Sequence, residues 1–181
     1  MRALVVYASS YGATKGIAER IAETIRGEGP QVDLVSADDP SIFETTAYDA
    51  FVIGSAIHAG HWLKPAIEFV RANRPLLKGA PVWLFSSGPI GEKAVGEPQP
   101  DPKEIDEVRD LVHVRDHMVF GGSFDPETAN LERIGWLEKQ IATHFLPVGD
   151  WRNWEDIEAW SRQIAAAIKA DATAQQPVLV S

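Results

Sequence analysis

The sequence contains no cysteine. Disulfide bonds, thiol catalysis, zinc sites with cysteine ligands and iron–sulfur clusters are therefore excluded, and this composition suits a reducing compartment. Basic residues are also in short supply, because 17 lysines and arginines stand against 26 aspartates and glutamates, for a formal net charge of −9. Proteins that bind nucleic acid usually carry charge of the opposite sign, so a nucleic-acid partner is disfavoured.

Long hydrophobic runs are absent as well. No apolar segment approaches the ~20 residues that a membrane-spanning helix needs, and residues 1–2 lead directly into a strand-like run. We therefore expect no signal peptide and no stable membrane insertion. The 181 residues are 45% hydrophobic and 24% charged, which is typical of one folded globular domain. These limits leave a cytoplasmic enzyme or a carrier of small molecules.

Apolar, strand-like runs alternate along the chain with segments of helical periodicity. Three runs are apolar throughout, as strands buried on both faces of a parallel sheet are; they span residues 3–8, 50–54 and 81–86. Two further runs mix in polar residues and suit the edges of a sheet; they span residues 32–35 and 117–122. Helical spacing of apolar residues predicts helices between these strands, at residues 17–25, 63–73 and 102–114.

This βαβαβαβαβ pattern predicts an α/β fold of three layers, with a five-stranded parallel sheet between two layers of helices. If the three apolar strands are central and the second and fifth strands lie at the edges, the strand order is 2-1-3-4-5, that of a doubly wound sheet. Two helices are expected after the fifth strand, at residues 131–145 and from residue 153, where a minimal fold needs one. We expect residues 1–170 to form the domain and residues 171–181 to form a flexible tail.

The loop after the first strand has the composition of a phosphate site. Ser9, Ser10 and Thr14 place three hydroxyls between a buried strand and a helix, and Gly12 allows the backbone to approach a ligand closely. The start of the helix adds free N–H groups and a partial positive charge. These residues also suit a plain helix cap and turn. Ligands of doubly wound sheets bind where the connections change direction, and this loop lies there, which favours the phosphate site.

Other phosphate-binding and catalytic motifs are missing. Residues 14–15 lack the upstream glycines of a P-loop, and Gly12 and Gly16 do not complete the G-x-G-x-x-G fingerprint of a dinucleotide site. The third strand ends at Gly54 and not at the aspartate of a phospho-acceptor domain, and no G-x-S-x-G nucleophile elbow occurs. The prediction is therefore a loop that holds a phosphate through hydroxyls and backbone N–H groups.

Four segments resemble known flavoproteins. Residues 7–14, Tyr-Ala-Ser-Ser-Tyr-Gly-Ala-Thr, resemble the FMN-phosphate loop of flavodoxins, and residues 48–55 resemble the strand that leads to the second flavin loop. Residues 53–61, Ile-Gly-Ser-Ala-Ile-His-Ala-Gly-His, and residues 150–155, Asp-Trp-Arg-Asn-Trp-Glu, resemble the flavodoxin-like, menaquinone-dependent protoporphyrinogen oxidase family. That family oxidises protoporphyrinogen IX to protoporphyrin IX with FMN and passes the electrons to a quinone, in haem biosynthesis. The similarity covers about residues 1–170.

The resemblance implies a flavodoxin-like fold, an FMN cofactor and no metal. The phosphate would lie in the first loop, on Ser9, Ser10, Tyr11, Gly12, Ala13 and Thr14. The isoalloxazine ring would lie between a second and a third loop, made of Ser55, Ala56, Ile57, His58, Ala59, Gly60, His61 and Trp62, and of Ser86, Ser87, Gly88, Pro89, Ile90 and Gly91.

The second loop carries the candidates for chemistry at the ring. His58 and His61 are the candidate catalytic residues for proton supply, because histidine is the side chain whose reference pKa, near ~6.5, is closest to neutral pH. The alternative is a pair of surface histidines without a role. A metal pair of these histidines has no evident third ligand. Gly60 has the backbone freedom to turn its peptide toward the flavin. The third loop has no aromatic residue, so we expect Trp62 to cover one ring face and a substrate to reach the other.

Three functions follow from these observations. The first is an FMN-dependent oxidoreductase that takes a porphyrinogen as substrate and a quinone as acceptor. The alternative is an electron-transfer flavodoxin that docks protein partners through its acidic surface. The third is a module of the same fold without flavin.

Contact with a membrane is the part of the family's function that this sequence supports least. The family places an insertion thought to serve membrane or quinone contact where residues 131–145 stand here. The amphipathic pattern of these residues favours a core helix. Because its charges cancel and the chain carries −9 overall, we expect at most transient contact with the inner face of the membrane.

Overall fold

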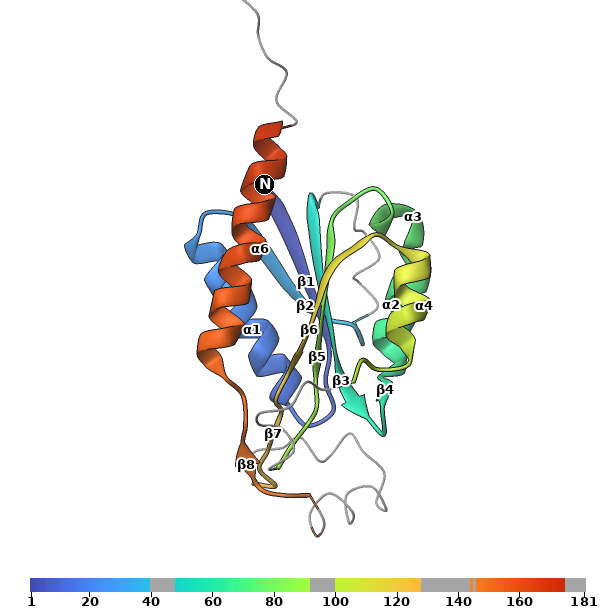
Figure 1. Cartoon of the computed structure of the whole chain (residues 1–181), viewed down its shortest axis with the longest axis vertical. Coiled ribbons are helices and arrows are strands. Elements are labelled where there is room, and N and C mark those ends of the chain that lie inside the picture. The colour runs from blue at the N-terminus through green and yellow to red at the C-terminus, as the bar shows by residue number, and fades with distance from the viewer. Residues whose placement is uncertain (40–47, 92–99, 128–143, 145, 175–181) are drawn as a thin grey trace, which may run out of the picture.

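A computed structural model describes residues 1–39, 48–91, 100–127, 144 and 146–174. A parallel sheet forms the middle layer, with α1 and α6 on one face and α2, α3 and α4 on the other (Figure 1). The elements in chain order are β1 (Arg2–Ala8), α1 (Ala13–Gly27), β2 (Gln31–Ser36), β3 (Ala50–His58), β4 (His61–Trp62), α2 (Lys64–Ala72), α3 (Arg74–Leu77), β5 (Val82–Ser87), α4 (Glu104–Leu111), β6 (Val114–Phe120), β7 (Ser123–Phe124), β8 (Gly149–Asp150) and α6 (Trp154–Ala174).

The parallel strands follow the order β2-β1-β3-β5-β6, which confirms the predicted order 2-1-3-4-5. The more polar strands β2 and β6 lie at the edges, as predicted. The register places Ala8 beside Ser55 and Ser55 beside Ser86, so the carboxyl ends of β1, β3 and β5 meet at one edge of the sheet. The loops that follow these strands are therefore neighbours in space.

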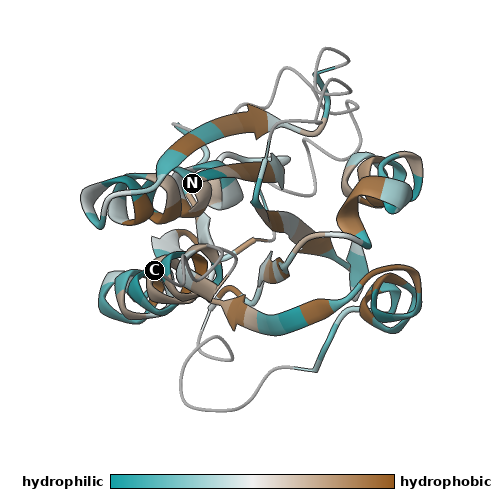
Figure 2. Cartoon of the chain, turned by 90° about the horizontal axis from the view of Figure 1, so that it is seen from above, coloured by the Kyte–Doolittle hydropathy of each residue, from teal (hydrophilic) through white to brown (hydrophobic). Residues whose placement is uncertain are grey.

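Two apolar cores flank the sheet because helices cover both of its faces. Side chains alternate along β1, so Ala3 and Val5 belong to the core under α1 and α6, and Leu4 and Val6 belong to the core under α2 and α4. Figure 2 shows the sheet between the helices, with brown, hydrophobic residues along the strands. Burial on both faces explains why the central strands read as unbroken apolar runs.

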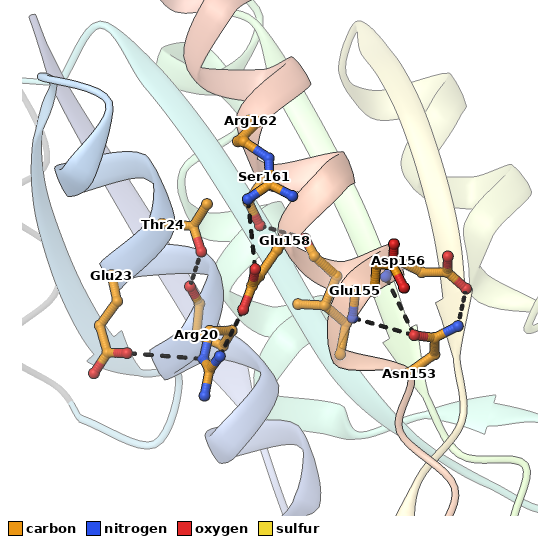
Figure 3. A network of polar contacts seen from close by, with 10 residues as sticks. Arg20, Glu23, Thr24, Asn153, Glu155, Asp156, Glu158, Ser161 and Arg162 are labelled. Carbon is orange, nitrogen blue, oxygen red and sulfur yellow. Dashed lines mark hydrogen bonds and ion pairs between the residues drawn. The ribbon is translucent and has the colours of Figure 1, made fainter.

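Helix α6 packs against α1 and begins as its sequence predicts. The side-chain oxygen of Asn153 accepts hydrogen bonds from the backbone N–H groups of Glu155 at 3.1 Å and Asp156 at 3.3 Å, which caps the helix (Figure 3). An ion pair of 2.6 Å joins Arg20 of α1 to Glu158 of α6 (Figure 3). The predicted stripe is buried; it consists of Ile157, Trp160, Ile164 and Ile168.

Several boundaries differ from those predicted. Helix α4 ends at Leu111 because Val112 has extended backbone angles, and β6 begins at Val114, before the predicted start at residue 117. Helix α6 continues through Ala174, into the segment 171–181 that the sequence predicts as a tail, and residues 175–181 lie outside the described part. The predicted helix at residues 131–145 also lies outside the described residues, apart from residue 144.

Candidate functional site

A cavity of about 400 Å³ opens at the carboxyl edge of the sheet. All three predicted loops contribute to it, together with the chain after β6. The lining residues are Ser9, Tyr11, Ala13, Thr14, Ala56, Ile57, His58, Ala59, Ser87, Gly88, Ile90, Gly122, Ser123, Phe124 and Leu146. The structure thus brings together residues from segments more than 130 positions apart, at the predicted switch point of the fold.

The first loop turns sharply into α1. Gly12 has a φ of 97°, in the left-handed region that favours glycine, and its backbone N–H donates to the Ser9 hydroxyl at 3.1 Å. The Thr14 side chain is only 1% exposed and faces the cavity. Ser10 does not line this cavity. Gly12 lines a second cavity, which adjoins the first and is described below. The first turn of α1 contains no acidic residue, although acids are favoured there, so its N–H groups meet no side-chain carboxylate in their own turn.

The second loop is a β-hairpin and not an irregular loop. Strand β3 continues through His58 and pairs with β4, and the turn residues Ala59 and Gly60 have φ angles of 50° and 81°, both positive as a type I′ turn requires. The Gly60 carbonyl accepts a hydrogen bond of 3.2 Å from the backbone N–H of Lys103. This places the Gly60 carbonyl against the start of α4, and Gly60 does not line the cavity.

The two candidate histidines lie in different surroundings. His58 lines the cavity, and its ring stacks on Tyr11 with the centroids 5.5 Å apart. His61 is the exposed residue of β4, and its Nδ1 is 2.6 Å from a carboxylate oxygen of Glu104. Burial alone raises the pKa of Glu104, but the hydrogen bonds from Trp62 N–H and His61 outweigh it and lower the pKa. Of the two histidines, only His58 is placed to act on a molecule in the cavity.

Trp62 does not cover the cavity, contrary to our expectation. Its side chain is 5% exposed and packs in the core under α2 and α4, where its indole N–H donates to the Ser86 hydroxyl at 2.7 Å. Strand β4 pairs back on β3, and this pairing turns residue 62 away from the cavity. The aromatic residues that line the cavity are Tyr11 and Phe124, in edge-to-face contact with centroids 5.4 Å apart.

The third loop approaches the hairpin closely. A Cβ at Gly88 would lie 2.6 Å from the Ile57 Cβ, so glycine is needed for this contact. Ser87, Gly88 and Ile90 line the cavity, whereas Ser86 is fully buried and Pro89 and Gly91 are not among the lining residues. The Pro89 carbonyl accepts a hydrogen bond of 2.8 Å from Gly122 N–H, which joins this loop to the chain after β6.

Four lining residues escaped sequence reasoning: Gly122, Ser123, Phe124 and Leu146. The first three follow β6, and the rule that parallel strands end at one edge of the sheet was the signal that could have found them.

A second cavity of about 460 Å³ adjoins the first, and both are lined by Tyr11, Ala13, Ser123 and Phe124. Asp150 and Arg152 line it too, and hydrogen bonds from Arg152 lower the pKa of Asp150.

Ser86, His117 and Asp101 form a chain of hydrogen bonds that runs from the buried Ser86 to the exposed Asp101. His117 Nδ1 lies 3.0 Å from Asp101 Oδ1, and because a carboxylate oxygen can only accept, Nδ1 is the donor. In the neutral tautomer that this defines, Nε2 accepts from the Ser86 hydroxyl at 2.8 Å, and the same hydroxyl accepts from the Trp62 indole N–H at 2.7 Å. Burial lowers the pKa of His117, and this effect outweighs the opposing effect of Asp101. The order of groups is that of a serine hydrolase, but Ser86 is fully buried outside the cavity. The chain of bonds therefore anchors β4 to the sheet.

This sheet, with its cavity at the carboxyl edge, is that of the flavodoxin-like class of α/β proteins. The chain belongs to the flavodoxin domain family, whose model matches residues 4–144. The protoporphyrinogen IX dehydrogenase (quinone) of Escherichia coli strain K12 is 27% identical over 93 residues, 51% of this chain and 51% of that protein. The chain therefore matches about half the length of its curated relatives. Membership of the family identifies FMN as the cofactor and electron transfer as the chemistry.

Solved structures show the same fold. A flavodoxin from the domain Archaea is 20% identical, with a TM-score of 0.61 over 93% of this chain and 99% of that one. The flavodiiron protein from Giardia intestinalis is 18% identical, with a TM-score of 0.66 over 97% of this chain and 38% of that one. Within the described part of the chain, no helix has the length and hydrophobicity for crossing a membrane, and no three metal-binding side chains cluster.

Proposed function

We propose that this chain is an FMN-dependent oxidoreductase that oxidises protoporphyrinogen IX to protoporphyrin IX and passes the electrons to a quinone. The observation that carries the proposal is the cavity at the switch point, which joins a hydroxyl-rich loop to an apolar wall of Ile57, Ile90, Phe124 and Leu146. The likeness to a protein named protoporphyrinogen IX dehydrogenase (quinone) supports the choice of substrate and acceptor.

The residues of the first loop fit the phosphate of FMN. Its donors are hydroxyls and backbone N–H groups, and the first turn of α1 carries no carboxylate to repel an anion. Ser9, Ser10, Gly12, Ala13 and Thr14 would hold the phosphate. The second and third loops would hold the ring through the residues that line the cavity, at 56–59, 87–88 and 90.

His58 would handle the protons of the reaction. When bound, FMN supplies two-electron transfer between substrate and acceptor. The His58 imidazole lies on the cavity wall, where a ring nitrogen can give or take a proton, and its stacking on Tyr11 holds the ring in place. We place the protein in the cytoplasm, where it would meet the quinone by transient contact with the inner face of the membrane.

Two measurements test this function in sequence. A visible absorption spectrum after addition of FMN and desalting should show retained flavin, and colourless protein would contradict every redox function. The holoprotein, given protoporphyrinogen IX and a water-soluble quinone, should then produce porphyrin fluorescence faster than the quinone alone. Retained flavin without porphyrin formation would contradict the porphyrinogen oxidase and favour the electron carrier.

A pair of histidine variants makes the test specific to the cavity. His58→Gln should retain FMN and lower the rate of porphyrin formation by about 100-fold, the lower range for loss of a general acid or base. His61→Gln is the control, because His61 lies outside the cavity and contacts Glu104, and it should keep the rate within about twofold of wild type. Equal rates in the two variants would remove His58 from the reaction.

An electron-transfer flavodoxin is the second candidate. The net charge of −9 favours it, because an acidic surface steers basic redox partners. Such a carrier would turn over with a flavoprotein reductase and a protein acceptor, at rates that fall as salt is added. The porphyrinogen assay with a free quinone separates the two candidates.

A further inference from the structure

We infer that Arg152 makes the flavin site selective for a phosphorylated flavin. The inference rests on the proposed function, in which FMN places its phosphate at the first loop. The feature that carries it is the second cavity, of about 460 Å³, where Arg152 lies among the same lining residues as Gly12 and Ala13. Among the described residues that line the two adjoining cavities, Arg152 is the one lysine or arginine.

Contacts on two sides hold the guanidinium in one orientation. Nε donates to Asp150 Oδ1 at 2.8 Å and Nη2 donates to Asp150 Oδ2 at 2.6 Å, which is a bidentate pair. The guanidinium carbon also lies 4.4 Å from the centre of the Trp154 ring. The side chain is 17% exposed, so it is held among its partners. Because Nε and Nη2 both donate to Asp150, Nη1 is the guanidinium nitrogen that does not contact this carboxylate.

Nη1 reaches the first turn of α1. A Cβ built on Gly16 would lie 2.7 Å from this nitrogen, so Arg152 occupies the space that any other side chain at position 16 would fill. A glycine inside a helix lowers stability relative to alanine. We assign the presence of glycine at position 16 to its contact with Arg152. Arg152 therefore places the Nη1 donors of a guanidinium that Asp150 pairs through its other nitrogens beside the N-terminal N–H groups of the same helix.

Lys15 is the other cation of this turn, and it is placed differently. Its Nζ lies 3.7 Å from Glu19 in an exposed pair, and it lines neither cavity. Exposed ion pairs of this kind contribute little to the stability of the fold. The half-enclosed Arg152 is the cation that a phosphate at Gly12 and Ala13 would meet.

The test compares FMN with riboflavin, which differs from it by the phosphate alone. Dissociation constants for both flavins are measured on the full chain through the quenching of flavin fluorescence. Arg152→Gln should weaken FMN binding about tenfold or more and leave riboflavin binding unchanged, because the lost group interacts with the phosphate. Arg152→Lys keeps the charge without the fork and should recover part of the preference.

Two further variants serve as matched companions. Arg20 also contacts the Trp154 ring, with its guanidinium carbon 5.1 Å from the ring centre, but it lies one turn beyond Gly16 along α1. The Arg20→Gln variant should therefore keep the wild-type ratio of the two dissociation constants. Gly16→Ala keeps Arg152 and displaces its Nη1, so it should lower the preference for FMN in the same direction as Arg152→Gln. It also keeps the test decisive if Arg152→Gln does not fold.

Each outcome bears on a different step. A lower preference for FMN in Arg152→Gln and Gly16→Ala, with Arg20→Gln unchanged, supports the inference. An equal loss of both flavins, or an unchanged ratio, would show that Arg152 only joins β8 to α1, and would overturn the inference while the proposed function stands. Wild-type protein that binds neither flavin would overturn the proposed function, and the inference with it.

Discussion

At the scale of single residues, Gly54 shows how a missing side chain builds the core. It lies in β3 beside Phe85 of β5, and a Cβ at position 54 would lie only 2.0 Å from the nearest carbon of the Phe85 ring. Phe85 is fully buried and contacts Phe120 and Trp160, so the ring has no free space to move into. The packing of the sheet beneath the site thus depends on Gly54, because only glycine leaves room for the Phe85 ring on the neighbouring strand.

We therefore expect Gly54→Ala to lower the free energy of unfolding by about 1–3 kcal/mol, the usual cost of overpacking a core. Gly27→Ala is the matched control, because Gly27 lies at the exposed end of α1 with no atom within 4 Å of an added Cβ. That variant should be neutral or stabilising by up to about 1 kcal/mol. Urea unfolding measures both, and equal values would contradict the close packing at Gly54.

At the scale of elements, α6 depends on the cap at its first turn. Asn153→Ala leaves the N–H groups of Glu155 and Asp156 without their acceptor and should lower the free energy of unfolding by about 1 kcal/mol. Asn153→Ser keeps a side-chain acceptor and should recover most of this loss. Thermal and urea unfolding measure the difference. If Asn153→Ala unfolds like the wild type, the start of α6 is held by its packing on α1 and not by the cap.

At the scale of the whole molecule, His117 links stability to pH. Its side chain is 1% exposed, and burial lowers its pKa below the ordinary 6.5. The unfolded chain therefore binds a proton at this histidine before the folded chain does, so its contribution is complete above about pH 6.5 and is lost as pH falls toward the lower folded pKa. Four carboxylates have lowered pKa values, and their contributions to stability are lost at lower pH; they are Asp33, Glu104, Asp150 and Glu158.

Between pH 7 and pH 5, the free energy of unfolding of the wild type should fall, and His117→Gln should show a smaller fall. Glutamine keeps a polar group for Ser86 without a group that titrates in this range. Urea unfolding at each pH gives the two slopes. Parallel slopes would mean that His117 is protonated in the folded chain as readily as in the unfolded one.

Much of the fold could be predicted because it depends on local pattern. Unbroken apolar runs indicate strands buried on both faces, and the charged residue within the run at 32–35 indicates an edge strand. The first loop could be predicted too, because its three hydroxyls and Gly12 lie between a buried strand and a helix, and the structure adds that Gly12 has a left-handed backbone. The structure confirms the strand order, and it places Ser9, Ala13 and Thr14 at the cavity.

The rest depends on partners far along the chain. Trp62 turned into the core because Ser86 offers its indole an acceptor, and His61 turned to Glu104, which lies 43 residues away. The sequence determined which residues form strands and which loop suits a phosphate, because backbone preference and burial on two faces act over a few positions. Only the tertiary structure decided which side chains face the cavity and that Gly16 makes room for Arg152, because packing joins segments whose spacing in the sequence carries no signal.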